Sequence, residues 1–285
     1  MARNPASTID GNAVAPDEPR VDTGEDEERE SWGSYLRFLA LVVLGVLAFR
    51  SFLFAPFTIP SESMLPRLMV GDYLVAAKWP YGYSDLSLPF GAKLIPGRVF
   101  AGLPERGEVV IFRHPVDGTD YIKRVIGLPG DTVAVREGRV VLNGRVLARS
   151  TPELLRVPVS PNTSCHGRAP VTDANGAKAC LYPVAFETLP AGPTYPVIDL
   201  GRTAADDFGP VTVPEGRLFV MGDNRDNSQD SRFPAQARGG VGLVPADLLV
   251  GRASMILWST DGSAEWAKPW TWLTAARWSR IGNLL

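Results

Sequence analysis

The chain has 285 residues, of which 45% are hydrophobic and 21% charged, with a formal net charge of −2 at pH 7. These values are ordinary for a folded protein and exclude a chain that is disordered throughout. They give no excess of positive charge with which to displace counterions from DNA or RNA, so no nucleic-acid partner is expected.

The N-terminal segment, residues 1–33, is acidic and poor in apolar side chains. Acidic residues crowd the stretch between positions 17 and 30, just before an apolar run begins. Such a composition buries too little apolar surface to offset chain entropy. A disordered tail is therefore expected here.

The next segment, residues 34–56, is predicted to be a membrane anchor. The run from Phe38 to Phe49 is uninterrupted and extends past Arg50 to Phe57, which gives about 20 residues or roughly 30 Å of helix. Arg50 lies near the end of this run, where its guanidinium can reach the lipid headgroups. A cleaved signal peptide and a buried soluble helix are the alternatives, but the long acidic leader and the ending "FLFAPFTIP" are atypical of a signal peptide.

After residue 57 the chain changes to short runs rich in β-branched residues and bounded by glycine and proline, such as "EVVIFRH", "DYIKRVIG" and "LLVGRASMILW". Asn143-Gly144 is the pair favoured in a type I′ hairpin turn, and Glu137-Gly138 precedes it in the same stretch. The sequence therefore predicts a mainly β fold for residues 57–285, an antiparallel β-sheet sandwich or barrel behind one N-terminal transmembrane helix.

Residues 150–215 are rich in proline and read as an insertion on this β domain. They contain the only two cysteines, Cys165 and Cys180. Two free thiols are one interpretation. An even number of cysteines, separated by a short loop in a domain attached to a membrane anchor, instead favours a disulfide in an oxidising compartment. The spacing of these cysteines and His166 does not match a zinc site, so no metal is expected.

The C-terminal tail, residues 264–285, is rich in tryptophan and carries several cations. Indoles and long cationic side chains are common at membrane interfaces, so the tail is expected either to rest on lipid or to pack on the β domain. The residues concerned are Trp266, Trp270, Trp272, Trp278, Lys268, Arg277 and Arg280.

Two serines, Ser61 and Ser63, follow the apolar run in "SESMLPRLMVGD". A serine nucleophile needs a neighbouring base, and the chain offers only His114 and His166 as histidines, neither of them in a recognisable Ser-His-Asp pattern. A lysine with a depressed pKa is the other kind of base.

Lys123 in "DYIKRVIGLPGD" is the candidate base. Strand alternation places it on one face with Tyr121 and Val125, and places Arg124 on the other face. A solvated surface lysine is the alternative interpretation. The polar stretch "MGDNRDNSQDSR" does not fit a calcium loop, and it is expected instead to hold a serine next to the catalytic amine.

The boxes "IPSESMLPRLMVGD", "RGEVVIFRHP", "DYIKRVIGLPGD" and "GDNRDNSQDSR" resemble, in order and wording, those of the bacterial type I signal peptidases, also called leader peptidases. The resemblance implies that Ser63 is the nucleophile, Lys123 the general base, and Ser61 an oxyanion-hole donor together with the Ser63 N–H. It implies that Ser228 orients the lysine and that the pair Asp230 and Arg232 fixes the loop. The implied substrate pocket consists of Phe57, Ile59, Pro60, Leu68, Tyr121 and Ile122.

The resemblance also implies a function and a location. The expected enzyme is a membrane-bound serine endopeptidase that removes N-terminal signal peptides from exported preproteins, through an acyl-enzyme, after small residues in Ala-x-Ala sites. No cofactor is expected, and the partners are exported preproteins and the lipid bilayer. The expected location is the bacterial inner membrane, crossed once, with the N-terminus cytoplasmic and the catalytic domain periplasmic.

Three departures from the family pattern stand out. Glu62 replaces a frequent glycine, Arg67 replaces a frequent threonine, and "FPAQARGGVGLVP" replaces Trp-Gly after Arg232. Two other classes of protein are alternatives. Self-cleaving repressors share the dyad but carry a DNA-binding domain where this chain has its anchor. In a non-enzymatic anchored β domain, acting in envelope assembly or sensing, Ser63 and Lys123 would be incidental.

Overall fold

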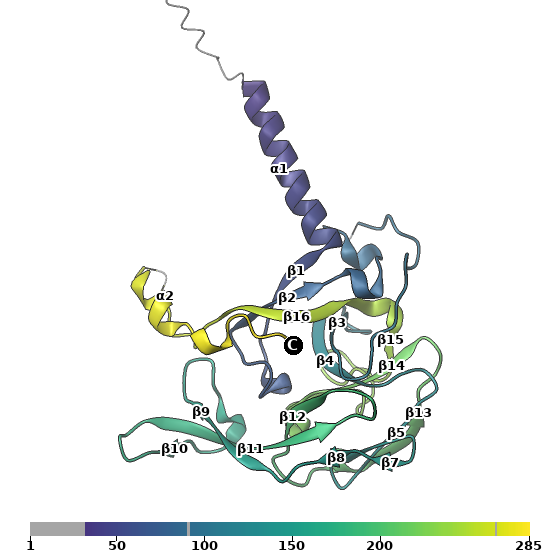
Figure 1. Cartoon of the computed structure of the whole chain (residues 1–285), viewed down its shortest axis with the longest axis vertical. Coiled ribbons are helices and arrows are strands. Elements are labelled where there is room, and N and C mark those ends of the chain that lie inside the picture. Colours follow the sequence, from purple (N-terminus) through teal and green to yellow (C-terminus); the bar gives the residue numbers. More distant parts are fainter. Residues whose placement is uncertain (1–31, 90–91, 266) are drawn as a thin grey trace, which may run out of the picture. The chain divides into compact units, whose positions relative to one another are not determined.

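The computed structural model describes residues 32–89, 92–265 and 267–285 (Figure 1). The predicted acidic tail lies outside the described residues, except for its last two positions, and so does Trp266.

Helix α1, Trp32–Phe52, is the one helix in the described part of the chain that is long and apolar enough to cross a membrane. Its apolar side chains are exposed on all sides, as expected of a helix that a bilayer covers. It ends at Phe52, earlier than the predicted end at residue 56, because the chain pairs as strand β1 (Phe54–Thr58) immediately afterwards.

The largest sheet is antiparallel and has seven strands in the order β1-β2-β16-β3-β4-β14-β15 (Figure 1). Neighbouring side chains of β3 enter different hydrophobic clusters: Val109 and Ile111 pack in one, Val110 and Phe112 in the other, so β3 is buried on both faces. The other strands of this sheet are β2 (Asp72–Ala77), β3 (Val109–Arg113), β4 (Asp120–Gly127), β14 (Arg217–Met221), β15 (Val244–Pro245) and β16 (Leu249–Ser259).

A four-stranded sheet contains the predicted hairpins, and it joins β13 (Phe208–Thr212), β5 (Thr132–Arg136), β6 (Arg139–Leu142) and β7 (Arg145–Val146) in that order. Glu137-Gly138 links β5 to β6, and Asn143-Gly144 links β6 to β7. All four turn residues have positive φ, as type I′ turns require. The mainly β, antiparallel prediction is confirmed.

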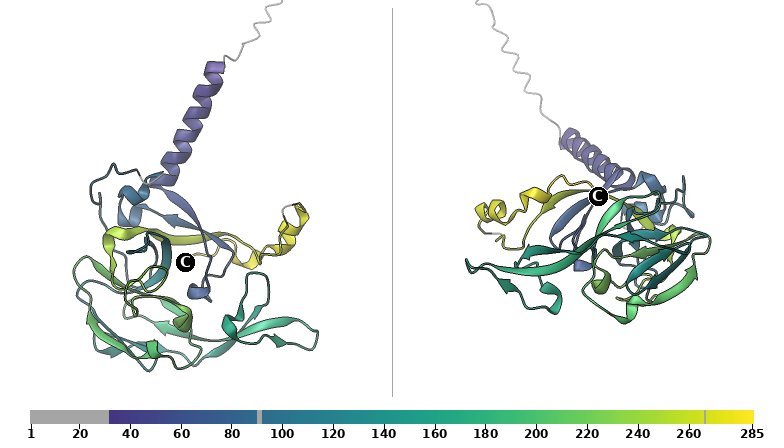
Figure 2. Two further views of the ribbon diagram at one scale, coloured as in Figure 1. Left: turned by 180° about the vertical axis from the view of Figure 1, so that it is seen from behind. Right: turned by 60° about the horizontal axis from the view of Figure 1, so that its bottom comes forward.

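The predicted insertion forms its own five-stranded sheet, part of which projects as an arm of teal and green strands in both views (Figure 2). This sheet begins at β8, just before residue 150. The last strand in the predicted range, β13, instead pairs with β5. The strands of the inserted sheet are β8 (Ala148–Arg149), β9 (Glu153–Pro158), β10 (Val171–Thr172), β11 (Lys178–Thr188) and β12 (Thr194–Ile198).

The tryptophan-rich tail contains helix α2, Trp270–Ala275. The Trp278 ring packs edge-on against Trp258 of β16, with the ring centroids 5.7 Å apart. Trp270 is 65% exposed and Leu273 is 60% exposed. The tail therefore combines one tryptophan packed on the sheet with apolar side chains that face outward.

Candidate active site

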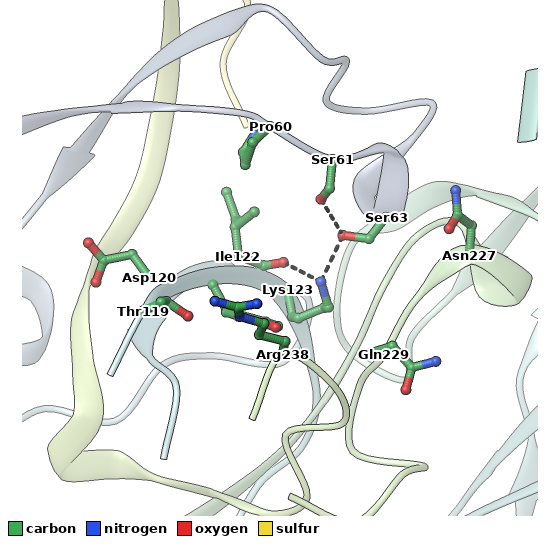
Figure 3. Close-up of a pocket in the computed structure, with 11 residues that line it drawn as sticks. Pro60, Ser61, Ser63, Thr119, Asp120, Ile122, Lys123, Asn227, Gln229 and Arg238 are labelled. Carbon is green, nitrogen blue, oxygen red and sulfur yellow. Dashed lines mark hydrogen bonds between the residues drawn. The ribbon is translucent and has the colours of Figure 1, made fainter. Parts of the chain in front are cut away.

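A cavity of about 420 Å³ opens between the turn after β1, strand β4 and the loop after β14 (Figure 3). Three chain segments that are far apart in the sequence thus meet around one space. The cavity is lined by Pro60, Ser61, Ser63, Thr119, Asp120, Tyr121, Ile122, Lys123, Asn227, Gln229 and Arg238.

Ser63 and Lys123 lie next to each other in this cavity. Ser63 sits in a single 3₁₀ turn, Glu62–Met64, and is 7% exposed; Lys123 sits in the middle of β4 and is 3% exposed. Lys123 Nζ donates to Ser63 Oγ at 2.7 Å and to the Ile122 carbonyl oxygen at 3.0 Å. The two bonds aim the amine at the serine hydroxyl (Figure 3).

The environment of Lys123 favours its neutral form. Burial, which penalises the ammonium, lowers the pKa of Lys123 to about 8, although Asp230 and Asp223 act in the opposite direction. The two carboxylates are themselves paired with arginines, because Asp223 binds Arg124 and Asp230 binds Arg232. A neutral amine within hydrogen-bond reach of a hydroxyl can accept its proton.

Ser61 lies two residues before Ser63, with its hydroxyl 3.3 Å from Ser63 Oγ. It is exposed and lines the same cavity. A hydroxyl at this position is close enough to donate to an oxygen that builds up negative charge beside Ser63.

The loop after β14 brings Asp230 and Arg232 together but does not pair Ser228 with Lys123. Asp230 and Arg232 form a buried bidentate pair, with both N–O distances at 2.9 Å, and Asp230 also accepts from the Gly222 N–H. Ser228 does not make the expected hydrogen bond to Lys123: its buried hydroxyl has no partner among the described residues. The Ile122 carbonyl accepts from the amine instead.

The predicted substrate residues divide into three groups. Pro60, Tyr121 and Ile122 line the cavity around the serine. Ile59 and Leu68 are buried in the hydrophobic cluster behind it, against which Ile122 also packs. Phe57 packs on that same cluster but lines a different cavity.

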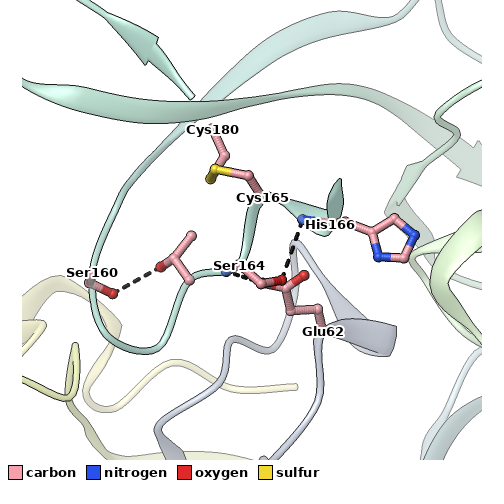
Figure 4. The surroundings of a disulfide bond; sticks show 7 residues. Glu62, Ser160, Ser164, Cys165, His166 and Cys180 are labelled. Carbon is pink, nitrogen blue, oxygen red and sulfur yellow. Dashed lines mark hydrogen bonds between the residues drawn. A yellow bond between two sulfur atoms is a disulfide. The ribbon is translucent and has the colours of Figure 1, made fainter. Parts of the chain in front are cut away.

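Sequence reasoning did not find the contacts that hold the turn Glu62–Met64, which carries Ser63. The Asn224 N–H donates to the Ser63 carbonyl oxygen at 3.1 Å, and Asn224 Nδ2 donates to the Glu62 carbonyl oxygen at 3.2 Å. Glu62 Oε1 accepts from the N–H of Ser164 at 3.0 Å (Figure 4). These pairings join positions more than 100 residues apart, and only the bond of the Glu62 side chain involves a position that departs from the family pattern.

Ser164 precedes Cys165, which is joined to Cys180 in a disulfide (Figure 4). Neither histidine is placed to act on Ser63. The buried His114 ring bonds to the Gly240 carbonyl oxygen, and His166 makes no hydrogen bond to Ser63. No cluster of potential metal ligands occurs within residues 32–89, 92–265 and 267–285.

The chain is similar to known signal peptidases. The chain is 36% identical over 241 residues to signal peptidase I of Rickettsia canadensis, and 34% identical over 235 residues to that of Rickettsia massiliae. Each alignment covers 81% of this chain and 80% of the relative. A crystal structure of a signal peptidase I from Enterococcus faecalis matches 53% of this chain and 97% of its own at 24% identity, with a TM-score of 0.29 that is too low to bear on the fold.

A family model described as signal peptidase, peptidase S26, matches residues 32–258, which include the apolar helix, Ser63 and Lys123. Because the matched family is a family of peptidases, the match supports an enzyme and not the alternative, a non-enzymatic β domain. The chain belongs to the signal peptidase family, peptidase S26, as a membrane-anchored hydrolase.

Proposed function

We propose that this signal peptidase removes signal peptides from exported preproteins with Ser63 as nucleophile and Lys123 as general base. The observation that carries the proposal is the 2.7 Å contact between Lys123 Nζ and Ser63 Oγ, made inside a site where the amine is desolvated.

The chemistry follows from these positions. The neutral Lys123 amine takes the proton of the Ser63 hydroxyl, and Ser63 Oγ attacks the scissile carbonyl carbon. The Ser61 hydroxyl and the Ser63 N–H stabilise the resulting oxyanion. The lysine ammonium then gives its proton to the leaving amine nitrogen, which leaves an acyl-enzyme. The same amine then deprotonates a water molecule, which attacks the acyl carbon. The lysine ammonium returns this proton to Ser63 Oγ as the ester bond breaks.

The cavity supports cleavage after small residues. Tyr121, Ile122 and Pro60 provide an apolar lining next to Ser63, which suits a methyl-sized side chain such as that of alanine and keeps the amine dry. The Ala-x-Ala preference belongs to this proposal.

The proposed location is the bacterial inner membrane, crossed once by α1, with the N-terminus in the cytoplasm and the catalytic domain in the periplasm. The Cys165–Cys180 disulfide supports this orientation, because disulfides persist in the periplasm and are rare in the cytoplasm. The partners would be preproteins emerging from the translocation machinery, held in the same bilayer.

The test is acylation by a serine-directed reagent such as a penem, together with cleavage of a preprotein. Ser63→Ala and Lys123→Met should each abolish labelling and cleavage. Lys178→Met, which changes an exposed lysine at the start of β11, is the matched control and should retain both. Full cleavage by Ser63→Ala would refute the proposed dyad.

A further inference from the structure

A second cavity, of about 360 Å³, lies where the last turn of α1 meets the catalytic domain. Leu47, Arg50 and Ser51 line it from the helix, together with residues of β1, the segment 86–89 and the ends of β3 and β4. It shares Asp120 with the active-site cavity but contains neither serine of the site nor Lys123. Three of its side chains are cationic and one is a carboxylate.

The first cation, Lys78, is buried without a neutralising partner. It is 5% exposed, and its Nζ donates to the carbonyl oxygens of Ser87 at 3.1 Å and Leu86 at 3.5 Å. An ammonium has three donors, so one remains for another acceptor. Burial, followed by the repulsion of Arg50, lowers the pKa of Lys78 to about 8. The structure thus contains a desolvated amine that an anion would stabilise in its charged form.

The other two cations also keep unused donors. Arg113 uses its Nε to bond Asp120 at 3.1 Å, while its terminal nitrogens have no partner in the described part of the chain. Arg50, in the last turn of α1, forms no hydrogen bond or ion pair with any described residue. A planar guanidinium with free terminal nitrogens fits the oxygens of a phosphate group.

The position of the cavity limits what its ligand can be. Arg50 lies two residues before the end of the apolar helix, which places its guanidinium at headgroup depth when α1 spans a bilayer. Apolar residues of the same cavity, including Leu47 and Phe57, lie beside the cations. A ligand that combines a phosphate with an acyl region matches both features.

We propose that this cavity binds the headgroup of an anionic phospholipid, with Arg50, Lys78 and Arg113 around its phosphate. The bound lipid would contact both the end of α1 and Asp120, the residue that lines this cavity and the active-site cavity alike. Basic pockets at the membrane surface hold acidic headgroups in this way, and each cation contributes about a fivefold gain in affinity.

The experiment uses the full chain in a neutral detergent, with phosphatidylglycerol titrated in and the protein–lipid complex counted by native mass spectrometry. Relative to the wild type, Arg50→Gln should bind phosphatidylglycerol about fivefold more weakly, and Arg50→Gln/Arg113→Gln about 25-fold more weakly. Arg145→Gln, which alters an exposed arginine of β7, is the matched control and should bind as the wild type does. These two arginine variants avoid the buried Lys78, whose replacement could unfold the chain.

Three further arms separate the sources of the ligand. Zwitterionic phosphatidylcholine should bind much more weakly than phosphatidylglycerol, and inorganic phosphate should not match its affinity. Equal affinity for phosphatidylglycerol in the double variant and the wild type would overturn the proposal. Equal affinity for inorganic phosphate and phosphatidylglycerol would also overturn it, because the site would then bind a free anion. Competitive displacement of the lipid by a preprotein would overturn it too, because the cavity would then belong to the substrate.

Discussion

At the scale of single residues, Lys123 suits the proposed role of general base because burial outweighs the nearby negative charges. Two aspartates attract the ammonium, yet each is already engaged by an arginine, which weakens its hold on Lys123. The desolvation of a side chain that is 3% exposed then lowers the pKa. An exposed lysine at the same distance from Ser63 would keep a pKa near 10.5 and would have a far smaller deprotonated fraction at neutral pH.

This environment predicts the pH dependence of the reaction. The base is the deprotonated amine, whose fraction rises with pH, so kcat/KM for a signal-peptide substrate should rise about tenfold per pH unit and level off above a pKa of about 8. The measurement is the pH–rate profile of the full chain, with protein stability checked at each pH. An inflection near the ordinary lysine value of 10.5 would show that Lys123 is not desolvated in the free enzyme.

Ser61 gives a second prediction at this scale. If its hydroxyl stabilises only the oxyanion, Ser61→Ala should lower kcat by about 10²–10³ with little change in KM, because the lost interaction is absent in the ground state. Ser61→Thr keeps a hydroxyl and should retain most of the activity. A rise in KM with unchanged kcat would instead make Ser61 a substrate-binding residue.

At the scale of elements, hydrogen bonds from two different segments hold the turn Glu62–Met64, which carries Ser63. Asn224, from the loop after β14, bonds the backbone of Glu62 and Ser63, while the Glu62 side chain bonds the segment that carries the disulfide. Glu62 is 8% exposed and its second oxygen has no partner among the described residues. The hydrogen bond from the Ser164 N–H is therefore the one described contact that fixes this carboxylate, so its position depends on the segment that carries Ser164.

We therefore expect the disulfide to influence catalysis through Glu62. Glu62→Ala should lower kcat about tenfold, the effect of losing about 1.4 kcal/mol of positioning, with KM nearly constant. Removing the disulfide with Cys165→Ser/Cys180→Ser should have a similar effect, and the combined variant should be no worse than either. Glu153→Ala, at an exposed carboxylate of the inserted sheet, serves as the control. Additive losses in the combined variant would show that the two features act separately.

The elements also show what one sequence can reveal. Strand alternation and the Asn143-Gly144 turn are local signals, so the β fold and its hairpins could be predicted. The motif boxes predicted Ser63 and Lys123 as the catalytic residues. The partners of Glu62 and the unused hydroxyl of Ser228 could not be predicted, because they depend on how segments distant in the sequence pack together.

At the scale of the whole molecule, the chain joins an apolar helix to a β domain that contains a disulfide. In the proposed function the helix would hold the enzyme in the same bilayer as its preprotein substrate, which would raise the effective concentration of one for the other. The arrangement is useful only if the β domain lies on the side where preproteins emerge.

Topology can be tested with a chain that carries an epitope tag at its N-terminus. In intact spheroplasts, added protease should degrade the catalytic domain and leave a small tagged fragment, because the tail should lie in the cytoplasm and α1 in the membrane. Cys165 and Cys180 should react with a membrane-impermeant maleimide only after reduction, since the disulfide forms in the oxidising periplasm. A strictly cytoplasmic protein and a secreted periplasmic protein provide the controls for leakage and access. Loss of the tag while the catalytic domain survives would reverse the proposed orientation.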